Sequence, residues 1–191
     1  CNITTLIFAY LEKQKIKTHW VSSPGAQSMV AKKVQIIPIE VVVRNVLAGS
    51  TAKKFNIDEG TPLAQPLVEF YFKDDALGDP FISDDQAVML KAATHAELSI
   101  LKEKALAINQ AMIPFFAAVG IRLVDFKVEF GRIGKSEIVL ADEISPDTCR
   151  LWDAGTGEKM DKDRFRRDLG HVKESYEKVW ELLKNYWESK V

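Results

Sequence analysis

The sequence contains only two cysteines, Cys1 and Cys149, among its 191 residues. Two cysteines are too few for the disulfide framework that stabilises small secreted domains, so we expect a reduced, cytoplasmic protein. The sequence also lacks an apolar run of about 18 residues, which is the length that a membrane-spanning helix needs. No cleavable secretion signal is evident either. These absences argue against a membrane partner.

The sequence has almost no excess of charge of either sign. Its 26 lysines and arginines oppose 27 aspartates and glutamates, which gives a formal net charge of -1. Such a balance provides no overall field that would attract nucleic acid, so we expect no nucleic-acid partner. With 47% hydrophobic residues, the chain can form a substantial core in one domain or in two closely coupled lobes.

Several familiar catalytic motifs are missing as well. The three histidines, His19, His95 and His171, do not have the spacing of metal ligands. The sequence contains no zinc pattern, Walker loop, dinucleotide glycine fingerprint or Ser-His-Asp arrangement. Cys149 has no neighbouring histidine in the sequence, so we do not expect a nucleophilic cysteine.

Hydrophobic periodicity predicts a mixture of strands and helices, and therefore an α+β protein. Thr94 and Glu97 form a capping box at the start of a long helix, and Gly120 suits its C-terminal end. Strands are expected at 18–21, 29–34, 40–47, 66–72, 122–130 and 137–143. Helices are expected at 3–11, with Asn2 as the cap, at 95–116 and at 165–186. Turns are expected at 22–25 and 131–134.

One predicted strand, 124–130, combines a regular apolar pattern with three charged side chains. Successive side chains of a strand point to opposite faces, so the apolar and the charged residues separate onto two faces. The apolar set is Val124, Phe126, Val128 and Phe130, and the charged set is Asp125, Lys127 and Glu129. A solvated strand face shows the same alternation, so this segment alone leaves two interpretations open.

The next predicted strand ends at Asp142 after an almost wholly apolar run. If the two strands pair across the short turn between them, Glu129 and Asp142 lie near each other. Two carboxylates in such a place suit Mg²⁺, which keeps several waters and takes phosphate oxygens in its remaining positions. Lys127 then supplies a positive charge that faces a transferring phosphoryl group.

Two residues upstream have features of an anion site. Arg44 lies within the apolar run 41–46, where a charge needs a partner or an anionic ligand. A structural salt bridge and anion binding both satisfy this need. Ser50 follows Gly49 and offers a hydroxyl and a backbone donor to phosphate if a helix begins at Thr51.

Two downstream segments are also rich in polar residues. The loop 145–150 directly follows a buried strand, where rigid scaffolds often present functional loops. Arg164, Arg166 and Arg167 open the last predicted helix. An isolated basic triplet of this kind is usually a solvated helix face.

These residues occur within longer motifs that resemble the SAICAR synthetase family. The motifs follow the family's order and approximate spacing over essentially the entire chain, and several such motifs together are a specific signal. They are Val41-Val42-Val43-Arg44-Asn45, Ala48-Gly49-Ser50, Lys73-Asp74-Asp75-Ala76, Asp79-Pro80, Val124-Asp125-Phe126-Lys127-Val128-Glu129-Phe130-Gly131, Asp142-Glu143-Ile144-Ser145-Pro146-Asp147, Arg150-Leu151-Trp152-Asp153 and Asp161-Lys162-Asp163-Arg164-Phe165-Arg166.

The resemblance implies a kinase-like architecture with two lobes and ATP between them. Residues 1–34 would be the remainder of the small lobe that covers the nucleotide, and residues 35–191 the large lobe with the metal and substrate sites. The segment 33–36 would form the hinge near the adenine. The family begins with a glycine- and lysine-rich strand pair over the ATP phosphates, and no segment of this chain matches it. Either that pair precedes Cys1 in the native protein, as a chain that starts with Cys1 favours, or the protein cannot bind ATP in the normal way.

The resemblance also implies roles for single residues. Glu129 and Asp142 match the family's residues for magnesium and nucleotide phosphate, and Lys127 matches its active-site lysine. Lys127 and Asp142 are therefore the expected catalytic residues. Lys73 matches a lysine on the nucleotide side. The positions that match substrate-binding residues are Arg44, Ser50 and Arg166 for the ribonucleotide and its phosphate, Asp79 and Arg150 for substrate, and Asp147 in the substrate loop.

The activity that the resemblance implies is that of an ATP-dependent ligase of de novo purine biosynthesis. Such an enzyme joins 5-amino-1-(5-phosphoribosyl)imidazole-4-carboxylate to L-aspartate and releases SAICAR, ADP and phosphate. ATP and Mg²⁺ are its expected cofactors, and a homodimer is the expected assembly. Two alternatives are another small-molecule phosphotransferase on the same scaffold and a non-catalytic nucleotide-binding fragment.

Overall fold

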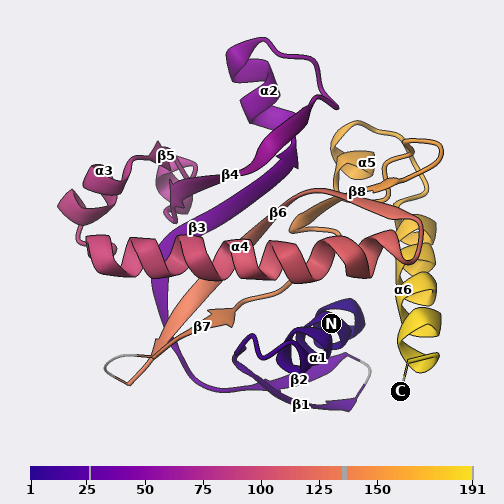
Figure 1. Ribbon diagram of the computed structural model, residues 1–191, viewed down its shortest axis with the longest axis horizontal. Coiled ribbons are helices and arrows are strands. Elements are labelled where there is room, and N and C mark those ends of the chain that lie inside the picture. Colours follow the sequence, from indigo (N-terminus) through magenta and orange to yellow (C-terminus); the bar gives the residue numbers. More distant parts are fainter. Residues whose placement is uncertain (26, 135–136, 191) are drawn as a thin grey trace.

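The structure is a computed structural model that describes residues 1–25, 27–134 and 137–190. Residues 26, 135–136 and 191 fall inside the two predicted lobes and lie outside the described residues. The elements along the chain are α1 (Asn2–Lys13), β1 (Trp20–Gly25), β2 (Ser28–Ala31), β3 (Gln35–Val46), α2 (Gly49–Phe55), β4 (Pro62–Phe72), η1 (Asp75–Leu77), β5 (Phe81–Ile82), α3 (Asp84–Met89), α4 (His95–Ala117), β6 (Ile121–Ile133), β7 (Glu137–Ala141), β8 (Cys149–Asp153), α5 (Asp163–Arg166) and α6 (Val172–Glu188) (Figure 1).

An antiparallel sheet forms the centre of the molecule. Within the described residues it has six strands in the order β5-β4-β3-β6-β7, with β8 also paired to β6. Strand β6 has 13 residues, so its first half pairs with β8 and its second half with β7. Strand β3 pairs with β6 on one side and with β4 on the other. The strands and helices confirm the predicted α+β class, and β1 and β2 form a separate two-stranded sheet.

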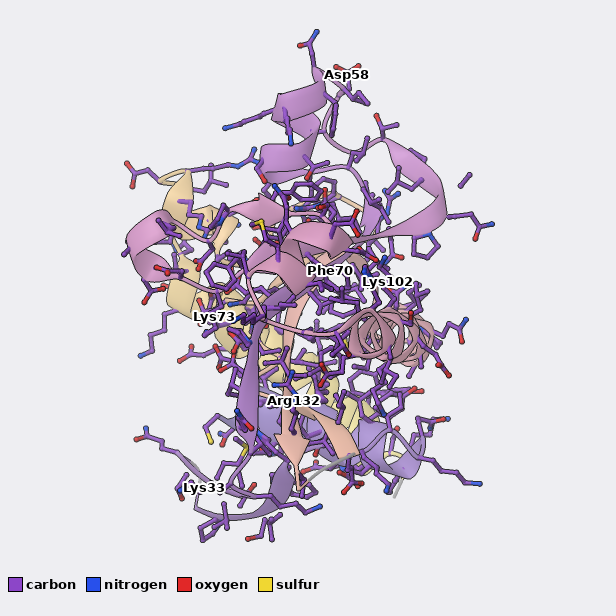
Figure 2. The ribbon with its side chains drawn as sticks, turned by 90° about the vertical axis from the view of Figure 1, so that its left-hand side faces the viewer. Lys33, Asp58, Phe70, Lys73, Lys102 and Arg132 are labelled. Carbon is purple, nitrogen blue, oxygen red and sulfur yellow. The ribbon has the colours of Figure 1, made fainter. Side chains whose placement is uncertain are left out.

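Helix α4 lies across one face of the sheet and closes the main hydrophobic core (Figure 1). Figure 2 shows this helix end-on beside the sheet, with Lys102 on the same side and Lys73 on the opposite side. The capping box predicted for its start is confirmed. The Thr94 side chain accepts a hydrogen bond from the backbone N–H of Glu97, and the Glu97 side chain accepts one from the backbone N–H of Thr94. Buried residues of α1, such as Phe8, join the same cluster as those of β3, α4 and β6. The division into lobes at residues 34 and 35 stays a prediction.

No described helix has both the length and the apolar character that crossing a membrane requires.

Several predicted turns and ends are wrong, and backbone pairing explains each difference. The predicted turn at 22–25 lies in β1, which stays paired with β2 as far as Gly25 opposite Ser28. The predicted turn at 131–134 begins too early, because residues 131–133 still pair with β7. Asn2 is the first residue of α1 and not its cap, which is Cys1. Thr18 lies before β1 and makes an isolated bridge.

The last predicted helix is divided into α5 and α6. Between them, Asp168, Gly170 and His171 have φ values of 53°, 67° and 53°. Positive φ is incompatible with a continuous right-handed helix. The apolar periodicity that predicts one helix over 165–186 therefore extends across a break that periodicity alone does not reveal.

Gly131 is a strand position where the side chain of Val34 leaves no room for a Cβ atom. A Cβ atom at Gly131 would lie 2.6 Å from Val34 Cβ, and still nearer to one of its methyl groups. We expect Gly131→Ala to lower the free energy of unfolding by about 1–3 kcal/mol, as overpacking does, measured by urea denaturation. In a Val34→Gly background the same substitution should lower the free energy of unfolding by a smaller amount. Equal costs in both backgrounds would show that Val34 is not the obstacle.

Candidate functional site

The predicted alternation along β6 is confirmed for most of the strand. Phe126, Val128 and Phe130 are buried in the main hydrophobic cluster. The charged residues of the opposite face are not solvated, since Asp125 is only 3% exposed and Glu129 only 2%. Buried charges need partners or ligands, so the interpretation as an ordinary solvated strand face is wrong.

Val124 departs from the predicted alternation. It belongs to a small separate cluster with Val46 and Ala48, whereas Leu123 joins the main core. The pairing of β6 with β8 shifts register between Leu123 and Asp125. An irregularity of this kind changes which side chains face the core, so the prediction for Val124 was wrong.

Strands β6 and β7 pair as predicted and bring the two proposed metal ligands to neighbouring positions. Glu129 lies opposite Ala141, and Asp142 follows Ala141 directly. The backbone of Asp142 has a positive φ of 58°, which takes the chain out of the extended conformation and ends β7. The Asp142 side chain is exposed, whereas Glu129 is buried.

Two lysines lie against Glu129. Lys73 Nζ is 2.6 Å from Glu129 Oε1, and Lys127 Nζ is 3.5 Å from the same oxygen. Lys127 also donates a hydrogen bond of 2.5 Å to Glu40. Burial lowers the pKa of Lys127, but the bond to Glu40 and the nearby carboxylates outweigh burial, and its pKa is raised above the ordinary value. Lys127 is therefore a cation at neutral pH.

A cavity of about 430 Å³, which we call the polar pocket, opens on this charged face of the sheet. Lys73 and Glu129 are absent from its wall, but Glu129 lies 3.5 Å from Lys127, which is part of the wall. The other predicted site residues all line the pocket, namely Arg44, Ser50, Asp79, Lys127, Asp142, Asp147, Arg150 and Arg166.

A chain of buried ion pairs runs beside the polar pocket. Asp125 Oδ2 accepts bonds from Arg44 Nη1 at 2.6 Å and from Arg150 Nη1 at 2.8 Å. Arg44 Nε also donates to Glu69 at 2.6 Å, and Arg150 Nε donates to Asp163 at 2.9 Å. The charges alternate in sign along this chain, so each buried charge has an opposite neighbour.

The structure favours a salt bridge among the two interpretations of Arg44. Arg44 is 4% exposed, and its remaining nitrogen, Nη2, lies 3.3 Å from the Tyr71 hydroxyl. Burial lowers the pKa of Arg44, but the charges of Asp125 and Glu69 outweigh burial and raise it. Binding of a ribonucleotide by Arg44 stays a prediction.

Three cations converge on one side of the polar pocket. Arg150, Lys162 and Arg166 all line its wall. Burial lowers the pKa of Lys162, and the charges of the two arginines lower it further. Ser50 lines the same pocket, and α2 begins at Gly49, one residue before Ser50 and not after it as predicted. A wall that concentrates positive charge and polar donors is suited to an anion.

The basic triplet separates into three environments, so its interpretation as one solvated face is wrong. Arg164 is buried and donates to Glu158 at 2.7 Å. Arg166 is exposed toward solvent and lines the polar pocket. Arg167 donates to both oxygens of Glu59, at 2.5 and 2.9 Å.

Among the residues of the pocket wall that the sequence did not predict are Glu40 and Lys162. Glu40, which holds Lys127, lies opposite Glu129 in the pairing of β3 with β6. A signal for it existed, because Glu40 and Arg44 stand four residues apart in a strand and so share a face. Lys162 gave no such signal, since only the return of the chain after β8 brings it to the arginines of the pocket.

Cys149 is buried, and burial raises the pKa of its thiol to about 12. Because the thiolate is the reactive form, we expect Cys149 to resist Ellman's reagent in the folded protein and to react in urea. Cys1 is exposed and should react in both states. A Cys149→Ala control should lose reactive thiol only in urea. Modification of Cys149 in the folded protein at the rate of an exposed thiol would contradict its burial.

The three histidines are also outside the chemistry of the pocket. His19 is buried and burial lowers its pKa, and His95 and His171 are exposed. None of the three lines the polar pocket, although all three are among the described residues.

Comparison with known proteins gives the same family at the level of sequence and of structure. The family model described as SAICAR synthetase matches residues 1–183. A phosphoribosylaminoimidazole-succinocarboxamide synthase from Halalkalibacterium halodurans is 55% identical over 178 residues, which are 93% of this chain and 75% of that protein.

Two solved structures have the same fold over nearly the whole chain. The crystal structure of phosphoribosylaminoimidazole-succinocarboxamide synthase from Ehrlichia chaffeensis has a TM-score of 0.92 and 45% identity, covering 96% of this chain and 78% of that chain. A SAICAR synthetase in complex with ADP has a TM-score of 0.93 and 43% identity, again over 96% of this chain and 78% of that chain. This chain therefore belongs to the SAICAR synthetase family.

Proposed function

We propose that this chain is an ATP-dependent ligase that joins 5-amino-1-(5-phosphoribosyl)imidazole-4-carboxylate to L-aspartate and releases SAICAR, ADP and phosphate. The observation that carries the proposal is the polar pocket, whose wall contains a cationic cluster together with Lys127 and Asp142. The synthase names of the related proteins and the ADP complex of a related structure support it.

In this proposal the ribonucleotide phosphate lies at the cationic side of the polar pocket. Ser50, Arg150 and Arg166 are its expected partners in the wall. Arg44 also lines the wall, is held by Glu69 and Asp125, and adds to its positive charge. Binding the distant phosphate in this way holds the imidazole carboxylate in place for reaction. This positioning accelerates the reaction far more than the phosphate contact would by itself. Asp79 and Asp147, also in the wall, are expected to contact substrate.

Amide formation from a carboxylate in water is unfavourable, so the carboxylate must first become a better electrophile. A carboxylate oxygen attacks the γ-phosphorus of ATP, a new O–P bond forms, and ADP leaves. The aspartate amine then attacks the carbonyl carbon, a C–N bond forms, and phosphate leaves with the C–O electron pair while the amine loses a proton. The Lys127 ammonium, kept cationic by Glu40, stabilises the negative charge on the transferring group. No protein nucleophile is required, in agreement with a buried Cys149.

Glu129 and Asp142 are the proposed ligands of Mg²⁺. Among the described residues there is no group of three or more His, Cys, Asp or Glu arranged for a metal. Mg²⁺ commonly binds through only one or two carboxylates and completes its coordination with water and phosphate oxygens, so this small donor set fits. When bound, the ion would neutralise charge on the phosphates of ATP. Lys73, paired with Glu129, is the proposed contact on the nucleotide side.

The resemblance that supports the activity also supports a cytoplasmic homodimer. The two free cysteines agree with a reducing compartment.

A coupled assay of ADP release tests the proposed function. We expect ADP release only when ATP, the imidazole carboxylate ribonucleotide and L-aspartate are all present, with SAICAR detected as the product. The controls are assays that omit either the ribonucleotide or L-aspartate. ADP release with many unrelated acceptors, but not with this pair, would favour another phosphotransferase. Calorimetric binding of the ribonucleotide without binding of ATP would favour a non-catalytic module.

A further inference from the structure

Glu59 makes a dense set of contacts in the connection between α2 and β4. Its carboxylate accepts bonds from Arg167 Nη2 at 2.5 Å and Nη1 at 2.9 Å, and from Lys159 Nζ at 2.9 Å. The backbone N–H of Gly49 also donates to it at 3.4 Å. Figure 2 shows the neighbouring residue, Asp58, at the end of the molecule opposite Lys33.

Two of the three partners of Glu59, Gly49 and Arg167, are next in sequence to residues of the polar pocket. Gly49 directly precedes Ser50, and Arg167 directly follows Arg166, and both Ser50 and Arg166 line the pocket wall. Glu59 itself does not line the pocket. It therefore joins the segment that carries Ser50 to the segment that carries Arg166, without itself lining the space where an anion would bind.

The same contacts continue into the buried chain of ion pairs. Arg167 Nη2 lies 3.5 Å from Asp163, which accepts from Arg150 at 2.9 Å. Gly49 packs directly on the Arg150 side chain, since a Cβ atom there would lie 2.8 Å from Arg150 Cζ. A displacement of Gly49 or Arg167 would therefore be transmitted to Arg150 as well.

We propose that Glu59 is a positioning residue of the anion-binding side of the polar pocket, where it fixes Ser50 on one segment relative to Arg166 on the other. This inference rests on the proposed function, because the anion is then the phosphate of the ribonucleotide. The opposing interpretation is a surface salt bridge without consequence for binding. The exposures of 30% for Glu59 and 39% for Arg167 mean that the pair contributes little to stability. An effect on binding would therefore distinguish the two interpretations.

The test is the Glu59→Gln variant of the full protein. We expect its KM for the imidazole carboxylate ribonucleotide to rise by about tenfold, because misplaced charged hydrogen-bond donors would bind the phosphate less tightly. The KM for ATP should not change, and the melting temperature should change little. Affinity for inorganic phosphate, measured by calorimetry, should fall by a similar factor.

Glu97→Gln is the matched control. Glu97 pairs with Arg132 at 2.6 Å, and both Glu59 and Glu97 have a pKa lowered to about 2, chiefly by hydrogen bonds from an arginine side chain. A glutamine at position 97 keeps the capping box, so this variant removes the ionic contact with Arg132, and neither residue lines the polar pocket. Its KM and phosphate affinity should match those of the unmodified protein.

A second variant, Arg167→Gln, tests the coupling. If Glu59 acts through Arg167, the double variant should have a KM for the ribonucleotide no higher than that of Glu59→Gln alone. Unchanged phosphate affinity in Glu59→Gln, or equal changes in Glu59→Gln and Glu97→Gln, would overturn the inference. Lack of ribonucleotide-dependent ADP release in the unmodified protein would instead contradict the proposed function, and the phosphate titration would still decide the role of Glu59.

Discussion

Replacement of Lys127 by methionine should reduce turnover by at least about a thousandfold, or about 4 kcal/mol of transition-state stabilisation, while the protein stays folded. Methionine preserves most of the volume of the side chain and removes its charge and its hydrogen-bond donors. Lys127 lines the polar pocket, and its ammonium lies 2.5 Å from Glu40 and 3.5 Å from Glu129. Without it, two carboxylates and the transferring phosphoryl group would face each other with one positive charge fewer. The measurement is kcat in the coupled ADP-release assay.

Lys102→Met is the matched control for this experiment. Lys102 pairs with Asp84 at 2.7 Å, but it lies on the side of the sheet that α4 covers, away from Lys73 (Figure 2). We expect this variant to retain normal turnover. Circular dichroism and the melting temperature would show that both variants are folded. Turnover within a few-fold of normal in a folded Lys127→Met variant would remove Lys127 from the proposed mechanism.

Replacement of Asp125 by asparagine should lower the free energy of unfolding by about 3–5 kcal/mol, as expected when a buried ion pair loses one partner. Asp125 is 3% exposed, and one of its oxygens accepts bonds from both Arg44 and Arg150. An uncharged amide leaves these two guanidinium groups close together with less opposing charge. The change in the urea midpoint at constant slope measures the effect.

Asp84→Asn provides the comparison for the stability experiment. Asp84 also pairs with a cation, Lys102, but its side chain is 44% exposed. Exposed pairs contribute about 0–1 kcal/mol, so this substitution should change stability little. Equal losses in the two variants would show that the burial of Asp125 is not the source of its effect.

The two experiments separate the two uses of the charged face of β6. Asp125 lies at the part of the strand where its neighbours are arginines of the buried ion-pair chain. Lys127 and Glu129 follow at positions two and four residues further, about 7 and 13 Å along the strand. The first position supports the fold of the pocket, and the next two provide the charges that we assign to phosphoryl transfer.

Local sequence patterns predicted the regular parts of the fold well. The period-two alternation in β6 gave the correct faces for Phe126, Val128 and Phe130, because a paired strand has no freedom to rotate a single side chain across the sheet. The start of α4 was also predicted correctly, since its capping box satisfies backbone donors within four consecutive residues. In both cases the deciding interactions are local in the chain.

Predictions failed where distant segments determine the backbone. The register shift against β8 moved Val124 out of the main core, and positive φ values at Gly170 and His171 divided the last helix. The alternatives for Arg44 also stayed open, because its partners Glu69 and Asp125 come from two other strands. No pattern within the local sequence contains this information.

By itself, the sequence determined the α+β class, the family resemblance and the identity of half of the residues that line the polar pocket. It did so because these depend on residue type, on periodicity and on the order of motifs along the chain. The tertiary structure decided which charges meet: Glu40 with Lys127, Asp125 with two arginines, and Glu59 with Arg167. The reason is physical, since ionic contacts act over a few ångströms in space, and only strand pairing and the return of the chain after β8 bring these groups within that distance.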